Sequence, residues 1–164
     1  MMSRRYSVAI ALVASLMIFA TGCSKKNKTE ESNVPATETA LTNELGSSDE
    51  GKAMGLQTVH FAFDSFALDT PSKEVLKNNA SIMKNNPGLK IQIEGHTDAR
   101  GGVQYNIALG EKRANAVRGY LTDMGINGDR VSTVSFGKEH PMDSGSSEAA
   151  YAKNRRANFV ITSR

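Results

Sequence analysis

The stretch EGHTDARGGVQYNIALGEKRA, residues 94–114, joins the two hydrophobic patterns that decide the fold of this chain. Before it, Leu89, Ile91 and Ile93 alternate with polar residues, which predicts a half-buried strand. From about Val103 the apolar residues recur at helical spacing. Four glycines lie within the stretch, and two of them separate the strand from the helix. We therefore expect a strand, a tight glycine-rich turn and a helix in direct succession.

The same kinds of pattern continue on both sides of this unit. Strands are predicted at 59–63, 89–93, 131–136 and 157–161. One helix is predicted to begin at residue 71 and to end at the segment 85–88, a second to run from about 103 to 124, and a short helical turn to lie near 148–153. Thr70 is the expected N-cap of the first helix, with Pro71 at its first helical position and Glu74 in its first turn. The order β-α-β-α-β-β predicts an α/β two-layer sandwich, with two main helices on one face of a small mixed four-stranded sheet.

An export signal is expected at the N-terminus. A mostly apolar run over residues 8–20 is shorter than the roughly 20 residues of a membrane-spanning helix and is typical of a secretory signal. It ends in the sequence ATGC, which resembles the lipobox of bacterial lipoproteins, although that pattern favours leucine where Ala20 stands. The resemblance implies that Cys23 becomes a lipidated N-terminus, and Ser24 after it favours the outer membrane. Without lipidation, this only cysteine is a free thiol or forms an intermolecular bridge.

A tether is expected between the cysteine and the folded domain. Residues 24–57 are rich in Ser, Thr, Asn and Glu, and no aromatic residue occurs between Phe19 and Phe61. Such a segment has too few bulky apolar groups to offset the entropy of ordering the chain. The predicted boundaries are 1–22 for the signal peptide, 23–57 for the lipidated cysteine with a disordered tether, and 58–164 for the folded domain.

Two side chains of opposite charge flank the glycine-rich turn. Asp98 follows the strand, and Arg113 lies fifteen positions later on the helix. Asn106 precedes Arg113 by two helical turns, so both point the same way. Gly101 and Gly102 expose backbone N–H groups near a helix N-terminus, which favours anions. The arrangement suits an amino-acid zwitterion at the end of a side chain, unless Asp98 and Arg113 simply pair with each other.

Residues 58–164 resemble the OmpA C-terminal-like family, and within it the peptidoglycan-associated lipoproteins. The resemblance rests on the segments VHFAFDSFALD, EGHTDARGGVQYNIALGEKRANAVRGYL, RVSTVSFGKEHP and EAAYAKNRRANFVI. It implies a non-enzymatic outer-membrane lipoprotein whose periplasmic domain binds meso-diaminopimelate of the peptidoglycan stem peptide. It also implies a periplasmic β-propeller partner of the Tol system.

The resemblance assigns roles to individual residues. Asp98 would hold the ligand ammonium and Arg113 a carboxylate, while further ligand contacts fall on Asn106, Asp64 and Arg155. Neighbours on a strand point to opposite faces, so only one of Arg155 and Arg156 can reach the site, and the resemblance favours Arg155. The expected wall residues are Thr97, Gly101, Tyr105 and Leu109.

Other classes of function have little support in the sequence. His96 and Asp98 lack a third metal ligand, so His96 is expected to be a hydrogen-bonded group at the strand end, and no metal or cofactor is expected. The segment SIMK at 81–84 matches the S-x-x-K motif, but it lies late in a helix and no K-T-G accompanies it. An excess of three positive charges in residues 58–164, together with export, argues against nucleic-acid binding. A module that binds only protein remains the alternative.

Overall fold

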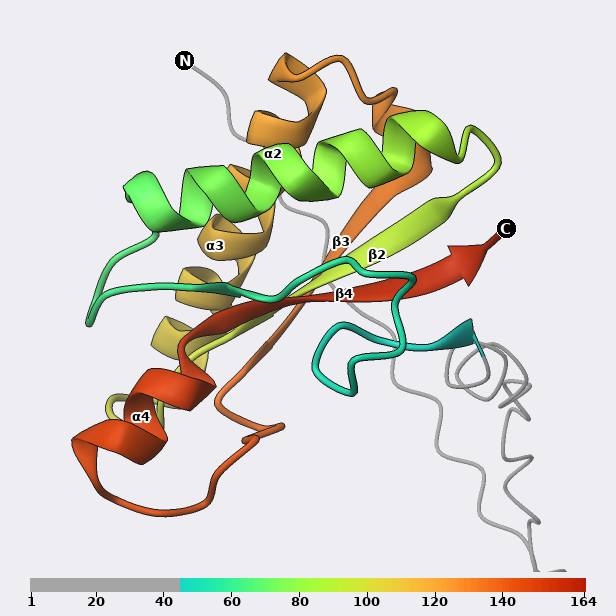
Figure 1. Cartoon of the computed structure of the whole chain (residues 1–164). Coiled ribbons are helices and arrows are strands. Elements are labelled where there is room, and N and C mark those ends of the chain that lie inside the picture. Colours follow the sequence, from blue (N-terminus) through green and yellow to red (C-terminus); the bar gives the residue numbers. More distant parts are fainter. Residues whose placement is uncertain (1–44) are drawn as a thin grey trace, which may run out of the picture. The chain divides into compact units, whose positions relative to one another are not determined.

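The computed structural model describes residues 45–164, and Figure 1 shows how its helices and strands are arranged. The predicted signal peptide at 1–22, Cys23 and the part of the predicted tether up to residue 44 lie outside the described residues. Within 45–164, no helix combines the length and the apolar character that a membrane span requires.

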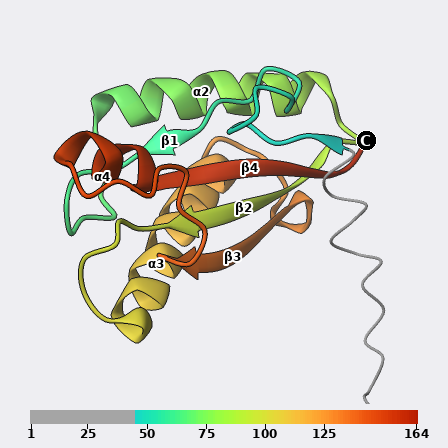
Figure 2. The ribbon, with the colours of Figure 1, turned by 90° about the horizontal axis from the view of Figure 1, so that it is seen from below.

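A four-stranded mixed sheet forms one layer of the domain. Its strands are, in chain order, β1 (Val59–His60), β2 (Lys90–His96), β3 (Val131–Gly137) and β4 (Arg156–Ser163). In space the order is β1-β4-β2-β3, which Figure 2 shows from below. The central strand β4 runs antiparallel to β1 and β2, whereas β2 and β3 are parallel. A parallel pair needs a crossover connection, and a helix between these two strands provides it.

Two long helices form the other layer. They are α2 (Thr70–Asn85) and α3 (Val103–Asp123), and both lie on the same face of the sheet in Figures 1 and 2. A 3-10 turn (Gly128–Arg130) follows α3, and the short helix α4 (Glu148–Asn154) precedes β4 at one end of the sheet. The predicted α/β sandwich with two main helices on one face is therefore confirmed.

The hydrophobic core lies between the helices and the sheet. Alternate residues of β2 and β4 face the helices, and Ile91, Ile93, Phe159 and Ile161 are all buried. The helices contribute apolar residues at helical spacing, among them Leu76, Ala80, Met83, Val117 and Leu121. Burying each large side chain contributes about 1.5–3 kcal/mol before entropy costs, so this layer holds the two helices on the sheet.

Two glycines bring α3 directly against β2. A Cβ atom added to Gly95 would lie 1.9 Å from the carbonyl oxygen of Gly110, and one added to Gly110 would lie 2.3 Å from Ser135 Oγ. Because neither glycine carries a side chain, the first half of α3 packs against the end of β2. This close approach places α3 beside the loop that follows β2.

The first strand is shorter than the sequence predicted. The alternation at 59–63 suggested a half-buried strand, but β1 ends at His60. Phe61 is still buried, whereas Phe63 is 59% exposed. Asp64 then has a positive φ of 52°, so the chain turns away from the sheet. Because β1 pairs with β4 only at Val59 and His60, the segment after Phe61 is a loop rather than a strand.

Helix α2 begins one residue away from the predicted cap. Its N-cap is Asp69, whose Oδ1 accepts a hydrogen bond of 2.8 Å from the Ser72 backbone N–H. Thr70 is therefore already helical rather than the cap. Glu74 lies outside the first turn and pairs instead with Lys77 at 2.7 Å.

The folded domain also begins earlier than the predicted residue 58. Ala53 and Leu56 are buried in the core, and the Gly46 carbonyl oxygen accepts a backbone hydrogen bond from the Ile161 N–H at 3.1 Å. Ser47 forms a β-bridge with Val160. Residues 45–57, expected to belong to the tether, thus cover the outer edge of β4.

Candidate functional site

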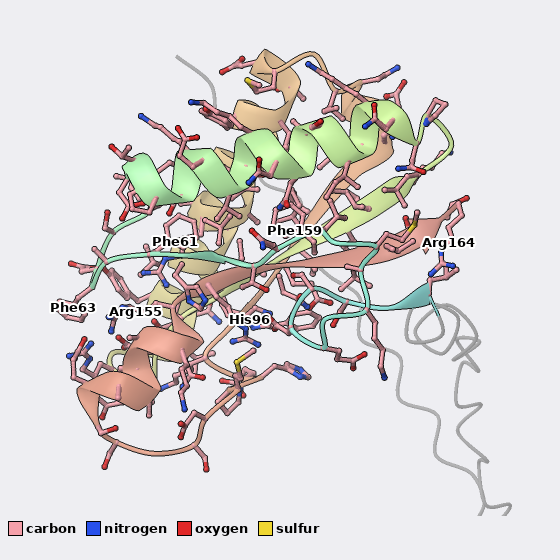
Figure 3. The ribbon with its side chains drawn as sticks, viewed as in Figure 1. Phe61, Phe63, His96, Arg155, Phe159 and Arg164 are labelled. Atoms are coloured by element: carbon pink, nitrogen blue, oxygen red, sulfur yellow. The ribbon has the colours of Figure 1, made fainter. Side chains whose placement is uncertain are left out.

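A pocket of about 240 Å³ lies where the loop after β1, the β2–α3 loop and the first half of α3 meet. Eight of the nine ligand-site residues predicted from the sequence line it: Asp64, Thr97, Asp98, Gly101, Tyr105, Asn106, Leu109 and Arg113. The ninth, Arg155, does not line the pocket, but its Nη1 lies 3.3 Å from Asp98 Oδ2. Figure 3 shows Arg155 and Phe63 at this end of the sheet, close to α4.

The glycine-rich turn shapes one wall of the pocket. Gly101 has a φ of 88°, a left-handed conformation that favours glycine. Gly102 is the N-cap of α3 and makes no side-chain cap hydrogen bond. Buried Asn106 holds the turn, because its Nδ2 donates to the carbonyl oxygens of Arg100 (2.8 Å) and Gly102 (3.1 Å). The open first turn of α3 therefore presents N–H groups and the positive end of the helix dipole near the pocket.

Arg113 is a buried cation held by backbone carbonyls. Its guanidinium donates to the carbonyl oxygens of Ser65 (2.8 Å), His96 (2.8 Å) and Ala62 (3.1 Å). Burial, followed by repulsion from Arg155, lowers its pKa to about 10, although nearby carboxylates oppose that shift. No carboxylate within residues 45–164 forms an ion pair with it. Direct pairing of Asp98 with Arg113, the alternative left open by the sequence, does not occur here.

Asp98 is paired with two other arginines. Its Oδ2 lies 2.6 Å from Arg100 Nη2 and 3.3 Å from Arg155 Nη1. Its Oδ1 accepts from the Arg100 backbone N–H at 3.1 Å and from Arg100 Nε at 3.3 Å. Burial raises the pKa of the Asp98 carboxyl, but these hydrogen bonds outweigh it and hold the pKa below its ordinary value. Asp98 is therefore an anion at neutral pH.

The two consecutive arginines at the start of β4, Arg155 just before it and Arg156 as its first residue, have separate environments. Arg155 Nε donates to the Phe61 carbonyl oxygen at 3.1 Å, and Arg155 Nη1 forms an ion pair with Glu148 Oε1 at 2.9 Å. Arg156 instead pairs with Asp49 at 2.7 Å. Of the two, only Arg155 contacts a residue that lines the pocket.

Sequence analysis missed two lining residues, Phe63 and Arg100. Phe63 was placed on a strand with its ring toward the core, whereas it faces the pocket from a loop. Arg100 was given no role in the sequence analysis. Its position could have suggested one, because a turn can bring side chains two residues apart, here Asp98 and Arg100, into contact. On the opposite wall, Tyr105 Oη donates a hydrogen bond to Asp64, which raises the tyrosine pKa.

His96 lies outside the pocket, and the expectation that it is hydrogen-bonded is wrong. Its ring is 2% exposed, and neither ring nitrogen has a hydrogen-bond partner among the described residues. Nε2 is 3.6 Å from Glu94 Oε2, and the ring stacks on Phe136. Burial lowers the pKa of His96, against the opposing effect of Glu94. No metal-binding group of three or more His, Cys, Asp or Glu side chains occurs in residues 45–164.

Comparisons with known proteins agree with this fold. The OmpA family matches residues 60–155. A peptidoglycan-associated lipoprotein of Pseudomonas aeruginosa is 36% identical over 160 residues, which cover 91% of this chain and 94% of that protein. The one from Pasteurella multocida is 46% identical over 100 residues, or 61% and 67% of the two chains.

A solved structure extends the likeness to three dimensions. The crystal structure of the peptidoglycan-associated lipoprotein from Burkholderia pseudomallei has a TM-score of 0.62 and 42% sequence identity, and the match covers 63% of this chain and 88% of that one. The family match covers more than half of the chain, and the full-length likeness to the Pseudomonas protein includes its N-terminal part. The chain therefore belongs to the OmpA family and groups with the peptidoglycan-associated lipoproteins.

Proposed function

We propose that this protein is a non-enzymatic outer-membrane lipoprotein that binds peptidoglycan through the meso-diaminopimelate of the stem peptide. The relatives are named for their association with peptidoglycan and as lipoproteins. The observation that carries the proposal is the pocket itself. It combines a buried arginine that has no carboxylate partner among the described residues with two carboxylates, Asp64 and Asp98.

The chemistry of the pocket suits a ligand that ends in both an amine and a carboxylate. Arg113 has five N–H donors, and three of its hydrogen bonds go to carbonyls. Carbonyl oxygens solvate a guanidinium but do not neutralise it, so a ligand carboxylate would compensate the buried charge. The first turn of α3 favours the same anion. Asp64 and Asp98 would receive the ammonium, which explains why the pocket holds charges of both signs.

Modest affinity at one site is compatible with firm attachment to the wall. A few charge-assisted hydrogen bonds, after ordering costs, give dissociation constants of roughly millimolar to micromolar. We propose that Cys23 is lipidated, so that many copies are held on one membrane with their domains facing the periplasm. Many anchored copies facing one polymer bind with high avidity.

A periplasmic β-propeller protein of the Tol system is a second proposed partner. Phe63 and Tyr105, which line the pocket, and nearby in the sequence Phe66 are large side chains that are about half exposed. Exposed aromatic groups of this kind suit a protein interface. Such a partner would cover the pocket, so peptidoglycan and the partner would compete.

Sedimentation with purified, protease-treated sacculi tests the proposed function. We expect Asp98→Asn to weaken the affinity for sacculi by at least about tenfold, because a charge-assisted contact contributes about 1.5–3 kcal/mol. The fraction of protein retained with the sacculi should fall accordingly. Asp143→Asn is the matched control, since that aspartate pairs with Lys153 away from the pocket. Free meso-diaminopimelate should release the wild-type protein. Equal retention of a folded Asp98→Asn variant would show that the assigned pocket does not bind the wall.

A further inference from the structure

Arg100 is held on four sides although its side chain is 37% exposed. Its guanidinium lies between the rings of Phe63 and Tyr151, at 4.0 and 4.4 Å from their centroids. Nη2 is 2.6 Å from Asp98 Oδ2, and Nη1 is 3.4 Å from Glu148 Oε2. One side chain thus connects the loop after β1, the β2–α3 loop and helix α4.

The acceptor capacity of Asp98 is already in use. A carboxylate offers about four lone-pair sites, and Asp98 receives four donors. Three of them come from Arg100, namely its backbone N–H, Nε and Nη2, and the fourth is Arg155 Nη1. A ligand ammonium therefore cannot bind Asp98 unless one of these donors leaves.

The guanidinium of Arg100 is the donor that can leave. Arg155 is 7% exposed and is also fixed by the Phe61 carbonyl oxygen and Glu148. The Arg100 backbone N–H is part of the turn. The Arg100 side chain, by contrast, reaches solvent and retains a partner in Glu148 after it releases Asp98.

We propose that Arg100 is an internal competitor that occupies the ammonium position of the pocket and sets the affinity for the ligand cation. The inference rests on the proposed function, because it concerns the same pocket. In an intramolecular competition, every ligand that places an amine at Asp98 loses affinity by the same factor. A ligand that binds without an amine loses nothing. Arg100 therefore keeps single-site binding weak and reversible.

The test uses the purified full-length chain and three synthetic stem tripeptides. The first ends in meso-diaminopimelate. The second has lysine in its place, which keeps the side-chain amine and lacks the side-chain carboxylate. The third has 2-aminopimelate, which keeps the side-chain carboxylate and lacks the side-chain amine. Dissociation constants are measured by NMR titration for the wild type, Arg100→Gln and Arg100→Lys. The Arg100 Nε–H resonance is followed in the wild type.

We expect Arg100→Gln to bind the diaminopimelate and lysine peptides roughly three- to tenfold more tightly than the wild type does, by the same factor for both. The 2-aminopimelate peptide should show no gain, and Arg100→Lys should be intermediate. The Arg100 Nε–H signal should shift on adding an amine-bearing peptide only. Weaker binding by Arg100→Gln, or an equal gain for all three peptides, would overturn the inference.

The two proposals fail in distinguishable ways. If the wild type binds the diaminopimelate peptide and Asp98→Asn does not, the proposed function holds whatever Arg100→Gln does. If the wild type binds none of the peptides, the proposed function is wrong and the inference falls with it.

Discussion

Replacing Arg113 with alanine should destabilise the domain as well as weaken binding. The guanidinium joins α3 to two other segments, because it donates to carbonyl oxygens in the loop after β1 (Ala62 and Ser65) and at the end of β2 (His96). The side chain is fully buried. Alanine would therefore remove three hydrogen bonds and leave their acceptors without this donor.

The expected loss follows from the burial of each group. The His96 carbonyl bond is fully buried and contributes about 2 kcal/mol, whereas the Ala62 and Ser65 carbonyls are partly accessible and contribute about 1 kcal/mol each. Losing two buried methylenes costs about 2 kcal/mol more. Removing the desolvated charge offsets about 3 kcal/mol, since burial lowers the pKa of Arg113 to about 10 and one pKa unit corresponds to about 1.4 kcal/mol. The net loss is about 3 kcal/mol.

Thermal unfolding followed by far-ultraviolet circular dichroism at neutral pH measures this loss. For a domain of this size, about 3 kcal/mol lowers the Tm by roughly 12 °C. Arg118→Ala is the control, because that exposed arginine also donates to carbonyls, those of Val131 and Gly128, and should lose about 1 kcal/mol or less. A folded Arg113→Ala variant that melts within 2 °C of the wild type would refute the reasoning. Arg113 would then serve the ligand alone.

Three further substitutions test other parts of the structure. Gly95→Ala should lower the free energy of unfolding, measured with denaturant, by about 3 kcal/mol or more, because the added Cβ would meet the Gly110 backbone. Gly119→Ala is the control and should not destabilise, because no atom lies within 4 Å of the added Cβ. Burial lowers the pKa of His96, so the unfolded chain takes up the proton first. The wild-type Tm should therefore fall as the pH drops below about 6.5, and His96→Gln should remove that part of the pH dependence. Asp49→Ala should speed amide exchange at residues 47–52, since its carboxylate binds β4.

The sequence was informative wherever the pattern is local. The alternation of Ile91 and Ile93 predicted β2, and the helix expected to end near residue 124 ends at Asp123, two residues before Gly125, whose φ is 90°. The N-cap of α2 was misplaced by one residue because Asp69 and Thr70 are adjacent and both are good caps. Only the geometry of the Ser72 N–H decides between them.

Long-range packing could not be inferred in the same way. Ala53 and Leu56 lie in the short segment AMGL, residues 53–56, which has neither helical nor strand periodicity, so nothing in their neighbourhood predicts that they reach the core. The early end of β1 has the same origin, since the alternation continues to Phe63 while the partner strand does not. Burial that depends on distant segments leaves no periodic signal.

In this site the sequence predicted which charged residues lie near each other but not which partners each of them has. Spacing predicted that Asp98 and Arg113 approach one pocket, and the structure brings both to it. Their partners follow from the loop conformation, which turns Arg100 onto Asp98 and surrounds Arg113 with carbonyls. Both charges are therefore already solvated by the protein. A ligand would replace internal contacts at Asp98 and add new ones at Arg113, so tight binding by one domain is not expected. Under the proposed function, firm attachment to the wall would depend on many anchored copies.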